Sequence, residues 1–262
     1  MKLELIGGGR MGEALLHGLL AAEWAEPADL AVVEKLPERR ATLEKLFPGV
    51  VVTDEPLAAD GAIIAVKPGD VDAAGRAIAT AGVGRVLSIA AGVPLARLES
   101  AVGAGVPVVR AMPNTPALVG AGAAAISPGQ DADDDDLLWA ESILRAVGTV
   151  VRVPEALLDA VTGLSGSGPA YVFLVAEALI DAGVLVGLPR PTAVALTSQT
   201  LLGAARLLAE TGDTPEALRA AVTSPGGTTA AGLRVLESAG VRAAFLDAVA
   251  AATERSKELG AS

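Results

Sequence analysis

The stretch at residues 2–12 reads Lys2-Leu3-Glu4-Leu5-Ile6-Gly7-Gly8-Gly9-Arg10-Met11-Gly12, a short apolar strand pattern that runs directly into a glycine turn. From Gly7 the glycines follow the spacing G-x-G-x-x-G, and residues 13–20 continue with an apolar helical pattern. Gly7 allows the tight turn, Gly9 allows a pyrophosphate to approach the backbone, and Gly12 allows the helix to pack closely on the strand. The order of strand, glycine turn and helix therefore predicts a dinucleotide-binding site.

Strand and helix patterns alternate through the rest of the first half. Further apolar strand patterns lie at Leu30–Val33, Val50–Val52, Gly61–Val66, Arg85–Ala90, Val106–Arg110 and Thr149–Arg152. Strands that are apolar throughout are typical of a parallel sheet with both faces covered. Only helical patterns follow the last strand. We therefore expect an α/β Rossmann domain with a mostly parallel sheet over residues 1–160, followed by an all-α domain over residues 161–262.

The end of the second predicted strand bears on the choice of cofactor. Glu34 stands where an acidic residue hydrogen-bonds the ribose hydroxyls, which favours NADH. Lys35, Arg39 and Arg40 follow, and they could neutralise the additional phosphate of NADPH. The sequence therefore leaves NADPH and NADH both open.

Three loops follow predicted strands, and ligands of such sheets bind beyond the carboxyl ends of the strands. In one of them Asn114 lies between two prolines that stiffen the loop, so its amide can be held in one orientation toward nicotinamide or substrate. Lys67 leaves an apolar strand where it could meet a carboxylate. The predicted cofactor site consists of Gly7, Gly8, Gly9, Arg10, Met11, Gly12, Glu34, Lys35, Val66, Lys67, Pro68, Ala90, Ala91, Gly92 and Asn114.

A second glycine turn lies in the helical half, at Ser224-Pro225-Gly226-Gly227-Thr228-Thr229, before a predicted helix at Ala230–Ser238. Glycines at this turn permit positive φ and close approach of a ligand. The free N–H groups and the dipole of a helix start attract a carboxylate or a phosphate without any Arg or Lys. A plain turn with a helix cap is the alternative for this turn taken alone.

Composition excludes several functions. The formal charge of −11 disfavours nucleic acid and anionic membranes as partners. The absence of cysteine excludes disulfides and thiolate chemistry, and a single histidine, His17, leaves no multi-histidine metal site, so we expect no metal. We expect no run that approaches the roughly 18 apolar residues of a membrane span. We also expect a cytoplasmic protein. The acidic run Asp131–Asp136 is interpreted as a solvated helix start without chemistry.

The predicted helices at Ala170–Gly183 and Thr192–Thr211 are apolar on most faces. Aromatic residues make up only 2% of the chain, so small side chains must fill the core and let helices approach closely. An apolar helical domain of this size does not easily bury its own surface. We therefore predict a homodimer built through this half of the chain.

Taken together, the motifs resemble those of the pyrroline-5-carboxylate reductases, which catalyse the last step of proline synthesis, and the resemblance covers essentially the whole chain. It is carried by Ile6–Gly12, Ala65–Pro68, Ala90–Val93, Arg110–Pro116, Asp159–Tyr171, Thr223–Thr229 and Arg234–Glu237.

The resemblance implies a Rossmann domain that binds NADPH or NADH, a helical dimerisation domain, and dimers that assemble further into rings. It implies reduction of 1-pyrroline-5-carboxylate to L-proline by hydride transfer to the imine carbon. Ser224, Gly226, Gly227 and Thr228 would hold the substrate carboxylate, and Thr229 would face the ring nitrogen as the catalytic residue. Arg10, which replaces a common Asn or Gln of the family, is expected at the pyrophosphate.

Two other functions remain open at this point. A β-hydroxyacid dehydrogenase also pairs a Rossmann domain with a helical one, but that family uses a catalytic lysine early in the helical domain. This chain has no lysine between Lys67 and Lys257. A non-catalytic NAD(P)H-binding scaffold is the other alternative, although such a protein has no evident use for a second anion site.

Overall fold

The computed structural model describes residues 1–260, which form two compact units. The first contains residues 1–167 together with the end of the last helix from Ala250, and the second contains Gly168–Val249. The sequence placed the domain boundary near Ala160 and assigned everything after it to the helical domain. In the structure the division into compact units falls between Ser167 and Gly168.

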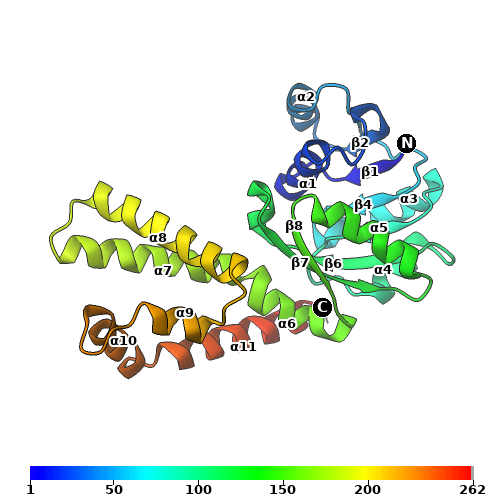
Figure 1. The fold of residues 1–262 in the computed structure, drawn as a ribbon. Helices are drawn as coiled ribbons and strands as arrows, with labels where there is room; N and C mark the ends of the chain where they lie inside the picture. The colour runs from blue at the N-terminus through cyan, green and yellow to red at the C-terminus, as the bar shows by residue number, and fades with distance from the viewer. Residues whose placement is uncertain (261–262) are drawn as a thin grey trace. The chain divides into compact units, whose positions relative to one another are not determined.

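The first unit is built on one eight-stranded sheet with the order β3-β2-β1-β4-β5-β6-β7-β8 (Figure 1). The strands are β1 (Leu3–Ile6), β2 (Leu30–Val33), β3 (Val51–Thr53), β4 (Ala62–Ile64), β5 (Val86–Ser88), β6 (Val108–Met112), β7 (Gly122–Pro128) and β8 (Gly148–Arg152). β1 to β6 are mutually parallel, β7 runs antiparallel to β6, and β8 is parallel to β7. The mostly parallel sheet is confirmed.

The strand β7 was missed in the sequence. Its first half, Gly122 to Ala125, contains only glycine and alanine, which have weak strand propensity. Pairing with β6 on one side and β8 on the other stabilises it instead. Tertiary context therefore overrides the local preference.

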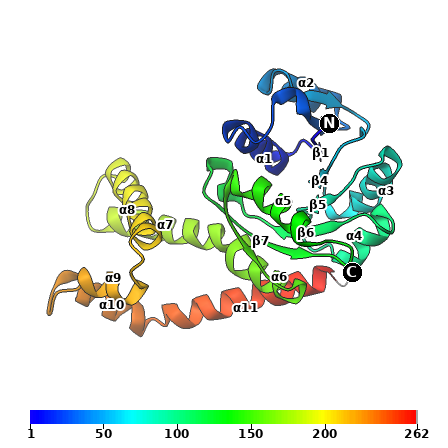
Figure 2. The same ribbon diagram turned by 45° about the vertical axis from the view of Figure 1, so that its right-hand side comes forward.

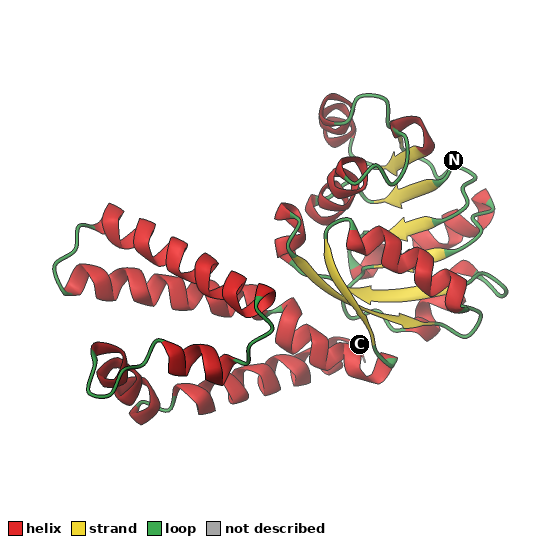
Figure 3. Cartoon of the chain, viewed as in Figure 1, coloured by secondary structure: helices red, strands yellow, loops and turns green. Residues whose placement is uncertain are grey.

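Helices cover both faces of the sheet (Figure 3). They are α1 (Arg10–Ala21), α2 (Pro37–Leu46), α3 (Val71–Ala81), α4 (Leu95–Val102), α5 (Asp134–Arg145) and α6 (Leu158–Val161). Short 3₁₀ segments lie at η1 (Pro27–Asp29), η2 (Pro68–Asp70), η3 (Thr115–Val119) and η4 (Glu155–Leu157), and a π-helical turn, η5 (Thr162–Gly166), follows α6. Leu5 of β1 packs with α1 and α5 in one core cluster, whereas Ile6 packs with α3 and α4 in the other. The alternating direction of side chains along the strand supplies both cores.

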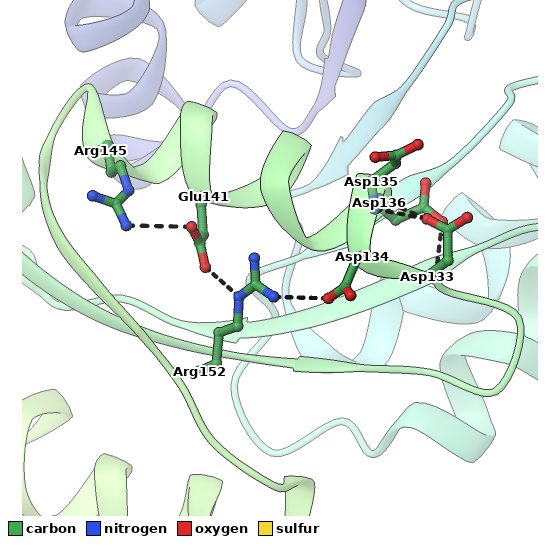
Figure 4. A network of polar contacts seen from close by, with 7 residues as sticks. All are labelled: Asp133, Asp134, Asp135, Asp136, Glu141, Arg145 and Arg152. Atoms are coloured by element: carbon green, nitrogen blue, oxygen red, sulfur yellow. Dashed lines mark hydrogen bonds and ion pairs between the residues drawn. The ribbon is translucent and has the colours of Figure 1, made fainter.

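The acidic run Asp131–Asp136 leads into the start of α5, as the sequence predicted, but Asp136 is buried rather than solvated and the run forms a capping box. The Asp133 side chain accepts hydrogen bonds from the N–H groups of Asp135 and Asp136, and the Asp136 carboxylate accepts one from the Asp133 N–H (Figure 4). Further along α5, Glu141 accepts from Arg145 and Arg152, and Arg152 also pairs with Asp134. These ion pairs, above all the hydrogen bond from Arg152, hold the pKa of Glu141 below its usual value. The network fastens β8 to α5.

The second unit is entirely helical. It contains α7 (Gly168–Leu185), α8 (Arg190–Glu210), α9 (Pro215–Ala221), α10 (Thr228–Ser238) and the first part of α11 (Val241–Gly260). α7 and α8 lie side by side as an antiparallel pair in both ribbon views (Figures 1 and 2). A Cβ at Gly183 would lie 3.0 Å from the Cβ of Ala193, so the glycine permits the close approach of the two helices.

The helices of this unit leave much of their apolar surface uncovered within one chain. Phe173, Leu174 and Leu185 of α7 are 62%, 66% and 86% exposed, and Leu246 of α11 is 73% exposed. The helical stretch Glu155–Leu185 is long and apolar enough, by length and composition, to cross a membrane. This corrects our expectation that no such run exists. The sequence reading counted uninterrupted apolar residues, whereas the structure joins α6, η5 and α7 across intervening Gly and Ser residues.

Candidate functional site

The glycine turn between β1 and α1 has the geometry of a phosphate cradle. Gly7 has φ 109°, and a Cβ there would lie 2.7 Å from the carbonyl oxygen of Ala65. A Cβ at Gly12 would collide with the carbonyl oxygen of Gly7. At Gly9, by contrast, a Cβ would meet nothing within 4 Å. Packing within the described chain explains why Gly7 and Gly12 have no side chain. The open space beside Gly9 suits a pyrophosphate that approaches the backbone. The residues present therefore fit a dinucleotide.

Glu34, which follows β2, and Arg39 of α2 bind the two polar groups of the Gly8 backbone. The Glu34 carboxylate accepts the N–H of Gly8 at 3.1 Å and the N–H of Leu36 at 2.9 Å. Arg39 donates from Nε to the carbonyl oxygen of Gly8 at 2.7 Å and pairs with Glu13 of α1. The middle of the glycine turn is thus fixed before any ligand arrives. The sequence named Glu34 and Arg39 but gave no sign of these contacts, because they join segments that are distant in the chain.

The loops after β4 and β5 meet at a cavity of about 500 Å³ in the first unit. Pro68, Ala91 and Gly92, all predicted site residues, line it. Because β1, β4 and β5 are parallel, these loops lie at the same edge of the sheet as the glycine turn. The structure thus brings together residues that the sequence could only place at strand ends. Val66 is half-buried, Ala90 is buried, and the Lys67 side chain is exposed.

Several residues lining the cavity were not predicted, namely Gly69, Arg97, Thr162, Ser167, Ala252, Arg255, Ser256 and Leu259. Both arginines already have carboxylate partners. Arg97 pairs with Asp72 at 3.0 Å, which lowers the pKa of Asp72, and Arg255 pairs with Glu258 at 2.6 Å. Thr162 and Ser167 lie within Asp159–Tyr171, one of the segments that carry the family resemblance. Residues of α11 gave no signal, because α11 reaches the cavity only through the tertiary fold.

Asn114 is held on both sides of its amide. Its nitrogen donates to the carbonyl oxygen of Ser165 at 2.9 Å, and its oxygen accepts the N–H of Ala123 at 2.8 Å. The two hydrogen bonds hold the Asn114 side chain in one orientation, as the sequence predicted, and they link the start of β7 to η5. Its role toward a ligand remains a prediction.

The Ser224–Thr229 turn lies in the second unit. Gly226 has φ 71°, and α10 begins at Thr228 with Gly227 as its N-cap. This corrects the predicted start at Ala230 and places both threonines in the first helical turn, because the N-cap is Gly227, which has no side chain to mark the start of the helix. In the described chain no side chain caps this helix start, and its first turn contains no acidic residue. A Cβ at Gly227 would collide with the Ser224 hydroxyl, so the glycine leaves that hydroxyl room. The Gly227 N–H donates to the Ser224 carbonyl oxygen at 3.0 Å, so the free N–H groups of the helix start begin at Thr228.

Within residues 1–260 no cluster of His, Asp and Glu side chains could hold a metal ion. His17 is an exposed residue of α1. The candidate features are the glycine turn and the cavity in the first unit and the turn before α10 in the second unit.

Comparison with known proteins identifies the relationship. A pyrroline-5-carboxylate reductase of Synechocystis sp. is 48% identical to this chain over 268 residues, which cover 99% of this chain and 98% of the relative. This chain belongs to the pyrroline-5-carboxylate reductase family. Residues 155–259 match the family described as pyrroline-5-carboxylate reductase dimerisation, and residues 2–92 match the one described as NADP oxidoreductase coenzyme F420-dependent. The resemblance drawn from the motifs is confirmed.

Solved structures of the family confirm the fold class. A pyrroline-5-carboxylate reductase from Coxiella burnetii matches with a TM-score of 0.93 and 39% identity, covering 98% of both chains. The pyrroline carboxylate reductase of Plasmodium falciparum, solved with NADP bound, matches with a TM-score of 0.84 and 30% identity over 99% of this chain and 98% of that one. The exposed apolar helices α7 and α8 fall within the matched dimerisation region.

Proposed function

We propose that this protein reduces 1-pyrroline-5-carboxylate to L-proline with NADPH or NADH as the reductant. The observation that carries the proposal is the uncapped, uncharged start of α10 behind the Ser224–Thr229 turn, in a member of this family that also has a dinucleotide turn. Main-chain N–H groups at a helix start bind a carboxylate well. In a chain of net charge −11, such a local site offsets the repulsion of an anionic substrate.

The substrate carboxylate binds to the Ser224 hydroxyl and the N–H groups of the turn, with Gly226, Gly227 and Thr228 providing backbone. Thr229 hydrogen-bonds the ring nitrogen. The bound reduced nicotinamide supplies the hydride for the imine carbon. A protonated cyclic imine is already electrophilic, so the chain contributes mainly alignment of the reacting groups and exclusion of water. The Ser224–Thr229 turn agrees with this mechanism, because its described residues offer hydroxyls and main-chain N–H groups rather than an acid–base pair of side chains.

The predicted cofactor residues divide into two groups in this proposal. Gly7 to Gly12, Glu34 and Lys35 serve the pyrophosphate and the adenosine ribose. Pro68, Ala91 and Gly92, which line the cavity of the first unit, serve the nicotinamide half of the cofactor together with Val66, Lys67, Ala90 and Asn114. A dinucleotide bound to a doubly wound sheet extends along the carboxyl ends of the strands, which agrees with this division.

The same proposal includes the domain plan and the assembly. Residues 1–160 form the dinucleotide-binding domain, and residues 161–262 form the helical domain for dimerisation and substrate binding. A homodimer forms through the helical domain and assembles further into a ring of dimers in the cytoplasm. The exposed apolar surface of α7, α8 and α11 supports association of this kind.

The test is an assay of the purified protein with each reduced cofactor and 1-pyrroline-5-carboxylate, followed by the absorbance of the reduced nicotinamide and by chromatography of proline. We expect stoichiometric loss of reduced cofactor and appearance of proline. A β-hydroxyacid dehydrogenase would instead reduce the cofactor's oxidised form with a hydroxyacid, and a scaffold would bind cofactor without consuming it. Either of these results, with no proline formed, would refute the proposal.

A further inference from the structure

We propose that this chain selects NADH over NADPH, with Glu34 as the specificity-determining residue. The proposal rests on the proposed function for the class of ligand and goes beyond it in naming the cofactor. The carboxyl end of β2 is where doubly wound proteins read the adenosine ribose, through an acidic residue for a free 2′-hydroxyl or through an arginine for a 2′-phosphate. This chain has residues of both kinds there, so their contacts decide between the two cofactors.

The Glu34 carboxylate is fixed at the glycine turn rather than free to swing into solvent. One of its oxygens accepts the Gly8 N–H at 3.1 Å and the other accepts the Leu36 N–H at 2.9 Å. A Cβ added to Gly8 would lie 3.3 Å from that first oxygen and would collide with Leu43 of α2. The carboxylate is therefore packed against the backbone of the turn. To move it away from a 2′-phosphate would break two hydrogen bonds.

The two arginines nearby are committed to the protein. Arg40 uses Nη1 to donate to the carbonyl oxygens of Glu34 and Lys35, at 2.8 and 2.9 Å, and its Nη2 lies 3.6 Å from Asp54. Arg39 donates to the Gly8 carbonyl oxygen and pairs with Glu13. Both side chains are about a quarter exposed or less. Neither offers its planar guanidinium to a phosphate without giving up these bonds.

Lys35 is exposed and is a flexible point charge rather than a bidentate phosphate ligand. Opposed to it stands the fixed Glu34 carboxylate, which repels the charge of a 2′-phosphate but accepts a hydrogen bond from a 2′-hydroxyl. A protein charge of the same sign beside a charged ligand group lowers the affinity for that ligand severalfold or more. The charges and hydrogen bonds at the carboxyl end of β2 therefore favour binding of NADH over NADPH.

The experiment measures binding of NADH and of NADPH to the full chain without substrate, by the fluorescence of the reduced nicotinamide. We expect NADH to bind on the order of tenfold more tightly than NADPH. In Glu34→Gln, which keeps the size of the side chain and removes its charge, we expect the ratio to fall toward one. Glu38→Gln removes a charge from an exposed residue of the same helix, α2, and should leave the ratio unchanged.

A second measurement needs no variant. Adenosine 5′-monophosphate should displace NADH from the wild-type chain better than adenosine 2′-monophosphate does. The proposal is overturned if NADPH binds as tightly as NADH, if Glu34→Gln keeps the wild-type ratio, or if the 2′-phosphate compound competes better. These outcomes are independent of the proposed reaction: proline formation with NADPH preferred would refute only the selectivity, whereas NADH selectivity without proline formation would refute only the reaction.

Discussion

Thr229 is the residue that the proposed reaction places beside the ring nitrogen. It lies half-buried in the first turn of α10. We expect Thr229→Ala to lower kcat about tenfold or more, because a hydrogen bond to a charged group is lost, while the melting temperature changes little. Thr80→Ala, in an exposed turn of α3, is the matched control and should keep full activity. Unchanged kinetics in Thr229→Ala would remove Thr229 from the mechanism.

Glu4 is a buried carboxyl group in the middle of β1. It is fully buried, one oxygen accepts the N–H of Leu57 at 2.8 Å, and the other has no partner within residues 1–260. Burial raises the pKa of Glu4 above 4.5, and the hydrogen bond from Leu57 opposes this only in part. The folded state therefore favours the protonated form. The contribution of the Glu4 carboxyl group to the free energy of unfolding is fully present below its pKa in the unfolded state. This contribution is lost as the pH rises through its pKa in the folded state.

We therefore expect Glu4→Gln, which cannot ionise, to be more stable than the wild type at pH 8, because the buried wild-type carboxyl group must lose its proton there. The difference should shrink as the pH falls toward 4.5. Urea unfolding at several pH values measures it. Glu44→Gln, at an exposed position of α2, should show no such trend. A difference that stays constant with pH would contradict the account of Glu4.

The same scale shows what the sequence could reveal of the site. Gly7, Gly9 and Gly12 were assigned separate reasons from spacing alone, and the space around each agrees with those reasons. The contact between Gly12 and the Gly7 carbonyl oxygen is local, so spacing is enough to predict it, whereas the contact between Gly7 and Ala65 comes from the segment after β4. The bonds of Glu34 and Arg39 to Gly8 could not be predicted, because they depend on how α2 packs beside α1.

At the scale of elements, the junction of the Ser224–Thr229 turn with α10 makes a testable unit. We expect Gly227→Ala to raise the KM for the substrate about tenfold, because the new Cβ displaces the Ser224 hydroxyl and costs a hydrogen bond to a charged group. Gly232→Ala, within the same helix and with open space at its Cβ, is the control and should keep the wild-type KM. An unchanged KM in Gly227→Ala would show that the hydroxyl is not part of the substrate site.

The start of α5 tests how much a capping box contributes to the first unit. Asp133→Ala removes the acceptor for two N–H groups, so we expect a loss of about 1 kcal/mol in the free energy of unfolding. Asp135→Ala changes the same turn without removing the cap, and we expect a loss of only a few tenths of a kcal/mol. Chemical denaturation of both variants makes the comparison. Equal losses would mean that the charge, not the cap, stabilises this turn.

Elements were predictable where local pattern and tertiary environment agree. β2 was predicted with its observed limits, since its four apolar residues are all buried. β7 was missed because small residues form a strand only when neighbouring strands pair with them. The start of α10 was placed two residues late, because a glycine N-cap gives no side-chain signal.

At the scale of the whole molecule, the apolar faces of the helical unit require partners. We expect sedimentation to show a dimer or a larger assembly without detergent. Phe173→Asp places a charge on a residue that is 62% exposed in one chain, and it should shift the protein toward monomers. Leu36→Asp, at a residue of the first unit that is 66% exposed, should leave the assembly intact. A stable wild-type monomer at micromolar concentration would contradict the predicted dimer.

The central claim is that main-chain N–H groups at the start of α10 capture the substrate carboxylate. A crystal structure of the protein with bound L-proline tests it most directly. The account predicts the carboxylate within hydrogen-bonding distance of the Ser224 hydroxyl and the N–H groups of the Ser224–Thr229 turn. A carboxylate bound elsewhere, for example by an arginine side chain, would contradict it.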